Sequence, residues 1–203
     1  MKCILQKKKF VKRSYYKIAL TFSAIFFMSC SDNSEVVKPI GQVRLEYPKS
    51  KFIDFNENAP YTFKYSDFAT IKKGKEKDWF NVHYPTMKAN IYLTYFPVQS
   101  HEDLVIKIKE SEKFVQEQTV KASFISPQTF EFKENKVYGT MYELGGQSAI
   151  NLQFHATDSL NHFISGSVYF SSEPKPDSLA PAIDYIKNDV QKLIETLAWR
   201  NKK

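Results

Sequence analysis

Apolar and polar positions alternate in three consecutive runs between residues 137 and 170. Alternation with a period of two is typical of β-strands that have one buried face. The first two runs meet at Gly145-Gly146, which we interpret as a two-residue turn because glycine adopts a positive φ without strain. That turn places Met141 opposite Ile150. The pattern therefore predicts an antiparallel meander of three strands.

Two registers are open to the second hairpin of this meander. A four-residue loop places Phe154 opposite Phe163 but sets the other apolar residues of the middle strand against serines. A five-residue loop, residues 157–161, places Phe154 beside Ile164 and keeps one apolar face across all three strands. Because the buried face fixes the register of a strand, we expect the five-residue loop.

The other face of the meander is polar but carries no charge. Its members are Tyr138, Tyr142, Asn151, Gln153, Ser165, Ser167 and Tyr169. A sheet surface that faces solvent usually includes Lys or Glu, so we expect this face to be covered by another layer or to meet a partner. Tyrosine is enriched at protein interfaces. The candidate partner-binding residues are Tyr138, Tyr142, Asn151, Gln153 and Tyr169.

A first amphipathic helix is predicted over residues 100–118. Ser100 is placed to cap its first turn, and Asp103 takes the capping-box position. Leu104 and Ile108 belong to an apolar stripe that is narrow.

A second amphipathic helix is predicted within residues 175–199. Asp177 or Ser178 is expected to cap it, and Pro181 then falls in the first turn, where its missing N–H is not needed. The apolar stripe here is wide, so this helix is expected to lie on the apolar face of the sheet.

The remaining segments indicate further strands. We expect strands at 60–66, 79–85 and 89–96, a charged loop at 67–78, and an extended run at 122–132 that is interrupted at Pro127. Together these elements predict an α+β fold, with a mostly antiparallel sheet of about six to seven strands in a meander, packed by two long helices.

The N-terminus has the pattern of a secretory signal. Seven Lys or Arg and no acid precede residue 18, and an uncharged, largely apolar run of eleven residues follows. That run is too short to span a bilayer, which needs about 20 residues. Ser29 directly precedes Cys30, as a bacterial lipoprotein signal requires. We therefore predict a signal peptide at 1–29, acylation of Cys30, a tether at 30–46 and one domain at 47–203.

Cleavage before Cys30 changes the charge and the cysteine chemistry of the chain. The full sequence has 29 Lys and Arg against 22 Asp and Glu, and removal of the seven leader cations leaves 22 of each. A neutral mature protein does not favour nucleic acid as a partner. Cys3 is lost with the leader and Cys30 is acylated, which excludes disulfides, thiol catalysis and cysteine-bound zinc.

Motifs that carry catalysis or metal binding are not found in this sequence. His155 and His162 point to opposite faces in the chosen register, so they cannot share an ion. The segment around Gly145 lacks the G-x-S-x-G pattern, and no Walker loop or G-x-G-x-x-G is present. The EF-hand spacing that begins at Asp54 lacks its glycine. We predict no catalytic residue, no metal and no cofactor.

The most specific stretches of the chain are the block at 138–146, the pattern HF-x-x-G-x-x-YF at 162–170 and the segment DSLAP at 177–181. Together with longer stretches such as WFNVHYPTMKANIYLTY, they resemble the gliding-motility lipoprotein family GldD of Bacteroidota. The resemblance covers nearly all of the predicted mature chain. The layout of hairpins and a terminal helix is also similar to the Mog1/PsbP-like α/β/α sandwich, which is an analogy of fold alone.

This resemblance implies a cell-envelope lipoprotein that is needed for surface gliding and for the linked type IX secretion system. It brings no enzymatic activity and no catalytic residue. The expected partners are a membrane, through the lipid on Cys30, and protein components of the gliding and secretion machinery. The domain is expected to face the periplasm from the inner or the outer membrane.

Two functions remain open from the sequence. The first is a non-enzymatic assembly or stability factor that docks through its uncharged, tyrosine-rich sheet face. The second is an envelope enzyme or carrier that acts on a peptide, glycan or lipid. An enzyme needs converging polar groups with shifted pKa values in a cleft.

Overall fold

A computed structural model describes residues 47, 49–171 and 176–200. For residues 176–178 it describes the backbone alone. The predicted signal peptide at 1–29, the lipidation site Cys30 and the tether at 30–46 lie outside the described residues. The structure therefore bears on the predicted domain alone.

The centre of this domain is a seven-stranded antiparallel sheet with the order β4-β5-β6-β10-β9-β8-β7. Its strands are β4 (Thr70–Lys73), β5 (Phe80–Tyr84), β6 (Ala89–Pro97), β7 (Ala122–Phe132), β8 (Val137–Gly146), β9 (Ile150–Thr157) and β10 (His162–Phe170). The helices are α2 (His101–Gln116), the short 3₁₀ helix η1 (Glu117–Val120) and α3 (Pro176–Glu195). The predicted α+β class, with an antiparallel sheet and two long helices, is confirmed.

Two small sheets complete the described domain. One pairs β1 (Phe52–Asp54) with β3 (Lys64–Ser66), and the other pairs β11 (Ala198–Trp199) with β2 (Tyr61–Thr62). The aromatic rings of Phe55, Tyr61 and Phe63 are buried and join the main hydrophobic core.

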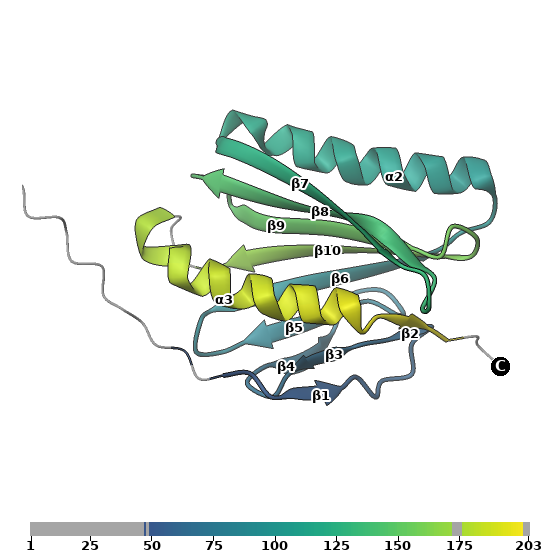
Figure 1. Ribbon diagram of the computed structural model, residues 1–203, viewed down its shortest axis with the longest axis horizontal. Coiled ribbons are helices and arrows are strands. Elements are labelled where there is room, and N and C mark those ends of the chain that lie inside the picture. Colours follow the sequence, from purple (N-terminus) through teal and green to yellow (C-terminus); the bar gives the residue numbers. More distant parts are fainter. Residues whose placement is uncertain (1–46, 48, 172–175, 201–203) are drawn as a thin grey trace, which may run out of the picture. The chain divides into compact units, whose positions relative to one another are not determined.

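Helices α2 and α3 lie on opposite faces of the large sheet (Figure 1). Alternate residues of β9 show this, because Phe154 belongs to the core that contains Ile186 and Val190 of α3, whereas His155 contacts Ser111 of α2. The α3 face holds the main core. The α2 face has a smaller apolar cluster in which Leu104 of α2 takes part.

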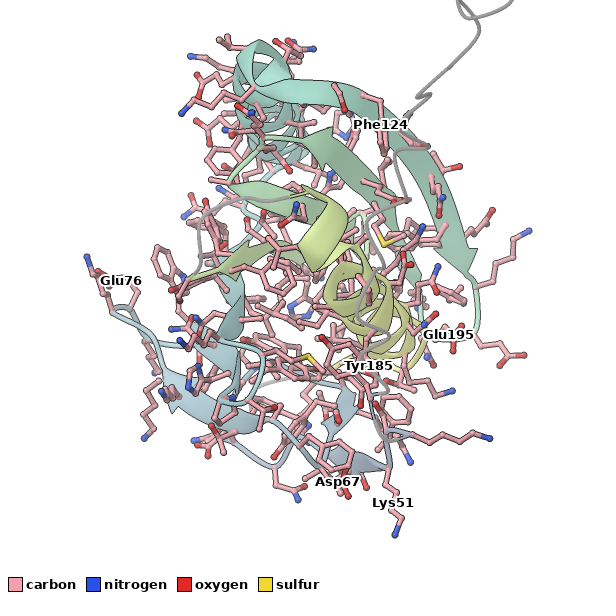
Figure 2. All side chains as sticks on the ribbon, turned by 90° about the vertical axis from the view of Figure 1, so that its left-hand side faces the viewer. Lys51, Asp67, Glu76, Phe124, Tyr185 and Glu195 are labelled. Carbon is pink, nitrogen blue, oxygen red and sulfur yellow. The ribbon has the colours of Figure 1, made fainter. Side chains whose placement is uncertain are left out.

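A buried carboxyl on α3 fastens the N-terminal end of the described chain. Ser50 donates a hydrogen bond to Asp189 at 2.8 Å, and the Tyr84 hydroxyl donates to the other carboxyl oxygen at 2.9 Å. The ring of Tyr47 lies 5.1 Å from that of Tyr185, which Figure 2 places on α3 above Lys51. Burial raises the pKa of the Asp189 carboxyl. The chain thus enters the domain on the α3 side of the sheet.

The start of α2 agrees with the predicted cap. Ser100 has extended backbone angles, and its side chain accepts from the Asp103 N–H at 3.2 Å. The Asp103 carboxylate accepts from the N–H of Gln99, one residue earlier than a capping box would place it, and pairs with Lys107 at 2.8 Å. Both interactions hold the first turn of α2.

The start of α3 differs from the prediction. The helix begins at Pro176, so Asp177 and Ser178 lie within it, and Pro181 is in the helix rather than in its first turn. Proline is favoured at the first helical position, which gives Pro176 that role.

The registers of the meander are also shifted. Met141 pairs with Phe154, not Ile150, because Gly146 pairs with Ala122 of β7 and the turn to β9 comes later than Gly145-Gly146. In the next hairpin, Phe154 pairs with Gly166 rather than Ile164. Both shifts move the partner by an even number of residues, so each strand keeps its predicted face.

One predicted loop contains a strand, and one predicted extended run lacks its expected interruption. The predicted charged loop at 67–78 contains β4, an edge strand of four residues that pairs with β5. The run at 122–132 is one continuous strand, and Pro127 does not interrupt it. Because β7 is the other edge of the sheet, a proline whose nitrogen points away from β8 removes no hydrogen bond of the ladder.

Phenylalanine rings lie across glycines of neighbouring strands, and this generates a stability prediction. A Cβ added at Gly166 would lie 2.1 Å from the ring of Phe154, which is fully buried. A Cβ at Gly145 would lie 2.0 Å from the ring of Phe124, which is 52% exposed. We expect Gly166→Ala to lower the free energy of unfolding by about 2 kcal/mol through overpacking.

Gly145→Ala is the matched control, and urea denaturation is the measurement. The exposed Phe124 ring is free to turn aside, so this variant should lose much less stability than Gly166→Ala. Equal losses for the two variants would contradict the idea that the buried ring sets the tolerance.

Candidate functional site

The sheet face under α2 is the one that the sequence marked as polar and uncharged. Helix α2 packs on β9 and β10, and the strands β6, β5 and β4 follow β10 toward the edge of the sheet. Residues opposite each other in antiparallel strands share a face. Tyr92 pairs with Ser167, and Ser167 with Gln153, so these residues share the face that α2 contacts.

The floor of this face is a closed network of hydrogen bonds. Gln153, which is 2% exposed, donates to Ser165 at 2.9 Å and accepts from Ser167. Thr94 donates to the carbonyl of Ser165 at 3.2 Å. These side chains satisfy one another, so the floor is polar and yet leaves few hydrogen-bonding groups for a ligand.

Aromatic rings stand above that floor. Tyr92 is 41% exposed, and its ring meets that of Tyr169 edge to face at 5.4 Å. Phe96 is 36% exposed and lies 5.7 Å from the Trp79 ring. The Lys107 ammonium of α2 sits 5.5 Å from the Phe96 ring centre. We call Tyr92, Phe96 and Tyr169 the aromatic face.

A cavity of about 300 Å³ lies between α2 and these strands. Its walls come from both sides of the groove: Thr94, Phe96, Lys107, Glu110, Ser111, Phe114, Gln153, Phe163, Ser165 and Ser167. The helix supplies one wall of this groove, and the sheet supplies its floor. On the far side, the lining ends at β6.

The five candidate partner-binding residues do not form one surface. Asn151 and Gln153 are buried in the sheet, whereas Tyr138, Tyr142 and Tyr169 are half-buried. Tyr138 and Tyr142 belong to β8, and Tyr169 belongs to β10 beside β6, so α2 divides the set. Tyr142 packs near His155 with ring centres 6.3 Å apart.

Sequence reasoning missed Tyr92 and Phe96, the most exposed members of the aromatic face. Both lie in a strand whose alternation is visible, so their shared face was predictable. Their link to Tyr169 was not, because β6 and β10 are far apart in the sequence and their pairing is a tertiary fact.

The predicted separation of His155 and His162 holds. His155 lies under α2, 3.4 Å from Ser111, and its ring stacks on Phe163. His162 lies on the other side, where Nδ1 is 2.8 Å from the Tyr95 hydroxyl and the ring stacks on Trp199.

A second hollow, of about 230 Å³, adjoins His162 and is lined by Pro60, Lys77, Asp78, Tyr95, Pro97, His162 and Arg200. Burial raises the pKa of Tyr95 to about 12, and burial also lowers the pKa of His162. Near neutral pH both groups are therefore uncharged. Arg200 donates to the backbone carbonyls of Phe55 and Glu57 at 3.2 and 3.1 Å, so its guanidinium helps to fix the chain around this hollow.

Neither a metal-binding cluster nor a membrane-spanning helix is present in the described ranges. Among these residues, no three His, Cys, Asp or Glu gather in a way that would hold a metal ion. Over the same residues, none of the helices combines the length and the apolar character that a bilayer crossing needs. The predicted absence of a metal and of a cofactor stays a prediction.

The fold and its site define a class of protein: an α+β domain with its main core on one face of the sheet and a partly open face that carries exposed aromatic rings. Residues 32–199 match the family described as gliding motility lipoprotein GldD, and the chain belongs to that family. The resemblance seen in the sequence is thereby confirmed. A search of curated proteins gave no match. Membership supports a role in gliding motility and an association with the cell envelope.

His155 generates a prediction about pH. Burial lowers its pKa from 6.5 to about 4. Because the folded-state pKa is below the unfolded one, the neutral imidazole contributes stability that is present above about pH 6.5. This contribution is lost as the pH falls through about 4. The difference corresponds to about 3 kcal/mol.

The test compares the native domain with His155→Gln by denaturant unfolding between pH 7 and pH 4. The native domain should lose about 3 kcal/mol more over this range than the variant, since glutamine does not titrate. Parallel pH profiles would contradict the buried neutral histidine. The comparison is of slopes, so a lower absolute stability of the variant does not affect it.

Proposed function

We propose that this protein is a non-enzymatic assembly or stability factor of the gliding-motility apparatus and the linked type IX secretion machinery. It acts by docking protein components while a lipid holds it at a membrane. Family membership supports the motility role. The open aromatic face supports docking, because aromatic residues are enriched in the energetically dominant parts of interfaces.

The lipid at Cys30 is the first part of this proposal. Residues 30–46 span at most about 60 Å when fully extended, so the domain stays near the membrane that holds the anchor. Tethering raises the local concentration of the domain around its partners. An interface of modest affinity is then sufficient.

The aromatic face is the second part. Tyr92 and Phe96 are exposed large hydrophobic side chains, and they adjoin a groove whose floor carries no charge. An uncharged floor is covered without the desolvation penalty that a buried, unpaired charge would bring. This observation carries the docking function.

The anchor is tested by mass measurement of the native protein and of Cys30→Ser. We expect the native chain to begin at Cys30 and to carry fatty acyl groups. The variant should lack them and should leave the membrane fraction. A native protein with an intact leader or a free thiol at position 30 would overturn the anchor.

Docking is tested in the native cells with three variants of the full-length protein. Tyr92→Ser combined with Tyr169→Ser removes two of the three rings of the aromatic face, and we expect recovery of envelope partners and gliding speed to fall at least tenfold. Tyr138→Ser combined with Tyr142→Ser changes the β8 side of α2. The control is Ile53→Ser in β1, where Ile53 is 43% exposed and thus matches Tyr92.

Loss of partners only in the Tyr92 and Tyr169 variant supports the aromatic face, provided that the domain keeps its thermal unfolding midpoint. Loss only in the Tyr138 and Tyr142 variant would move the docking surface to β8. Normal gliding and secretion in both variants would reject docking by this side of the sheet.

A further inference from the structure

We propose that the end of the domain at which the described chain begins lies against the phospholipid bilayer that holds the anchor. We call this part of the molecule the entry surface, and it consists of Lys49, Lys51, Ile53 and Phe68, with Lys72 and Lys73 of the edge strand β4. This inference rests on the proposed lipid at Cys30. It adds a second contact with the membrane, which sets how the domain is presented to its partners.

The entry surface is built by the small sheet of β1 and β3 and by the turn that follows β3. Ile53 pairs with Tyr65 across this sheet, and the Asp67 N–H donates to the Lys51 carbonyl at 2.8 Å. Phe68 is the next residue of that turn, and β4 begins two residues after it. Hydrogen bonds therefore hold these segments together as one part of the fold.

Two large apolar side chains of this surface are open to solvent. Ile53 is 43% exposed and Phe68 is 42% exposed. Other rings of the same segment are buried, because Phe55 and Phe63 belong to the main core. Single exposed apolar side chains are ordinary on a soluble protein. The argument for a membrane contact therefore needs the charges that surround these two.

The charge of the chain is unevenly distributed, and the entry surface lies in a basic part. Residues 49–75 contain six Lys and three acids, whereas residues 76–203 contain fourteen Lys and Arg and sixteen acids. Lys64 forms an ion pair with Asp54 at 3.7 Å. The lysines of the entry surface are exposed and have no such partner among the described residues. They can therefore attract an anionic surface.

A phospholipid bilayer fits this surface better than a second copy of the chain does. Two copies that met through the entry surface would bring like charges together, which opposes association. Headgroup phosphates instead accept hydrogen bonds from ammonium groups. Lysine stems can lie along apolar surface while their charged ends reach the headgroups. Lysines beside exposed apolar side chains are typical of protein surfaces that lie in the membrane interface.

The position of the surface along the chain points to the same occupant. Lys51 follows Cys30 by 21 residues, and a chain of that length spans at most about 75 Å. An acylated Cys30 thus keeps the entry surface within that distance of the bilayer at all times. A contact that is weak by itself is then favoured by the high local concentration of the domain at the membrane.

Contact through the entry surface would leave the groove beside α2 open. Figure 1 shows β1, β3 and β4 at one end of the domain, with α2 and β7 at the other. Figure 2 likewise places Lys51 and Asp67 at the end away from Phe124 of β7. A domain that rests on the membrane by the entry surface directs α2 away from the bilayer, toward protein partners.

The experiment uses the full-length, acylated protein in vesicles of phosphatidylethanolamine and phosphatidylglycerol. An environment-sensitive fluorophore is attached to the cysteine of Phe68→Cys, so that the label replaces the ring. The matched control is Phe124→Cys, because Phe124 is 52% exposed and lies at the other end of the domain. With a quencher on the lipid acyl chains, we expect fluorescence at position 68 to fall at least about threefold. Fluorescence at position 124 should stay nearly unchanged.

A second set of variants tests the lysines. Lys49→Glu combined with Lys51→Glu should reduce the quenching at position 68 several-fold, because two attractions to anionic headgroups become repulsions. Lys109→Glu combined with Lys121→Glu makes the same change of charge at exposed positions near the α2 end, and it should leave the quenching unchanged. Ile53→Ser alone leaves Phe68 and these lysines in place, so it should keep most of the contact.

Each contrary result overturns the membrane contact. Equal quenching at positions 68 and 124 means that the domain has no preferred side toward the bilayer, and quenching only at 124 means that it lies the other way round. Energy transfer between labelled copies, without quenching by lipid, indicates a dimer. An equal effect of the two lysine pairs means that net charge attracts the domain, whatever surface carries it.

The proposed lipid anchor fails under a different result. If the native protein does not float with vesicles in a density gradient, or if Cys30 itself reacts with the fluorophore, the anchor is absent and both proposals fall. If the protein floats while position 68 stays in water, the anchor stands and only the contact through the entry surface is wrong.

Discussion

The unequal covering of the two faces of one antiparallel sheet governs this structure. Side chains alternate between faces with a period of two, so every strand of the sheet contributes to both layers. The layer under α3 contains the main core and a dense set of aromatic rings. The layer under α2 contains a small apolar cluster and a polar network. Stability therefore depends mainly on the α3 layer, and the α2 layer is left available for contact.

The polar network makes such a surface compatible with a stable fold. An exposed apolar sheet face would promote aggregation, and a charged one would resist burial by a partner. Gln153 bridges Ser165 and Ser167, so the floor is satisfied whether water or protein covers it. The exposed rings of Tyr92 and Phe96 then supply the apolar area that a partner would cover. The satisfied hydrogen bonds of the floor allow it to be covered without loss, and the exposed rings provide the apolar contact area.

The sequence predicted the side of the sheet on which a residue lies better than it predicted which residues pair between strands. Alternation within a strand is a local property, so Phe154 and Gly166 were assigned to the correct side although their pairing was not. Turn chemistry misled at Gly145-Gly146, because an edge strand, β7, pairs there and tertiary pairing overrides the preference for a turn. β4 was missed because its lysines resemble a solvated loop, while lysine on an edge strand also blocks unwanted pairing. The aromatic face needed the β6–β10 pairing, which no local signal contains.

The first described residues of the chain and the candidate groove lie on different sides of the sheet. Ser50 and Tyr47 contact Asp189 and Tyr185 of α3, and the groove is bounded by α2. A partner bound beside α2 would therefore lie on the other side of the sheet from Tyr47 and Ser50. The buried Asp189 accepts from Ser50 and from Tyr84 of β5, so the entry of the chain is joined through one carboxyl to a central part of the sheet.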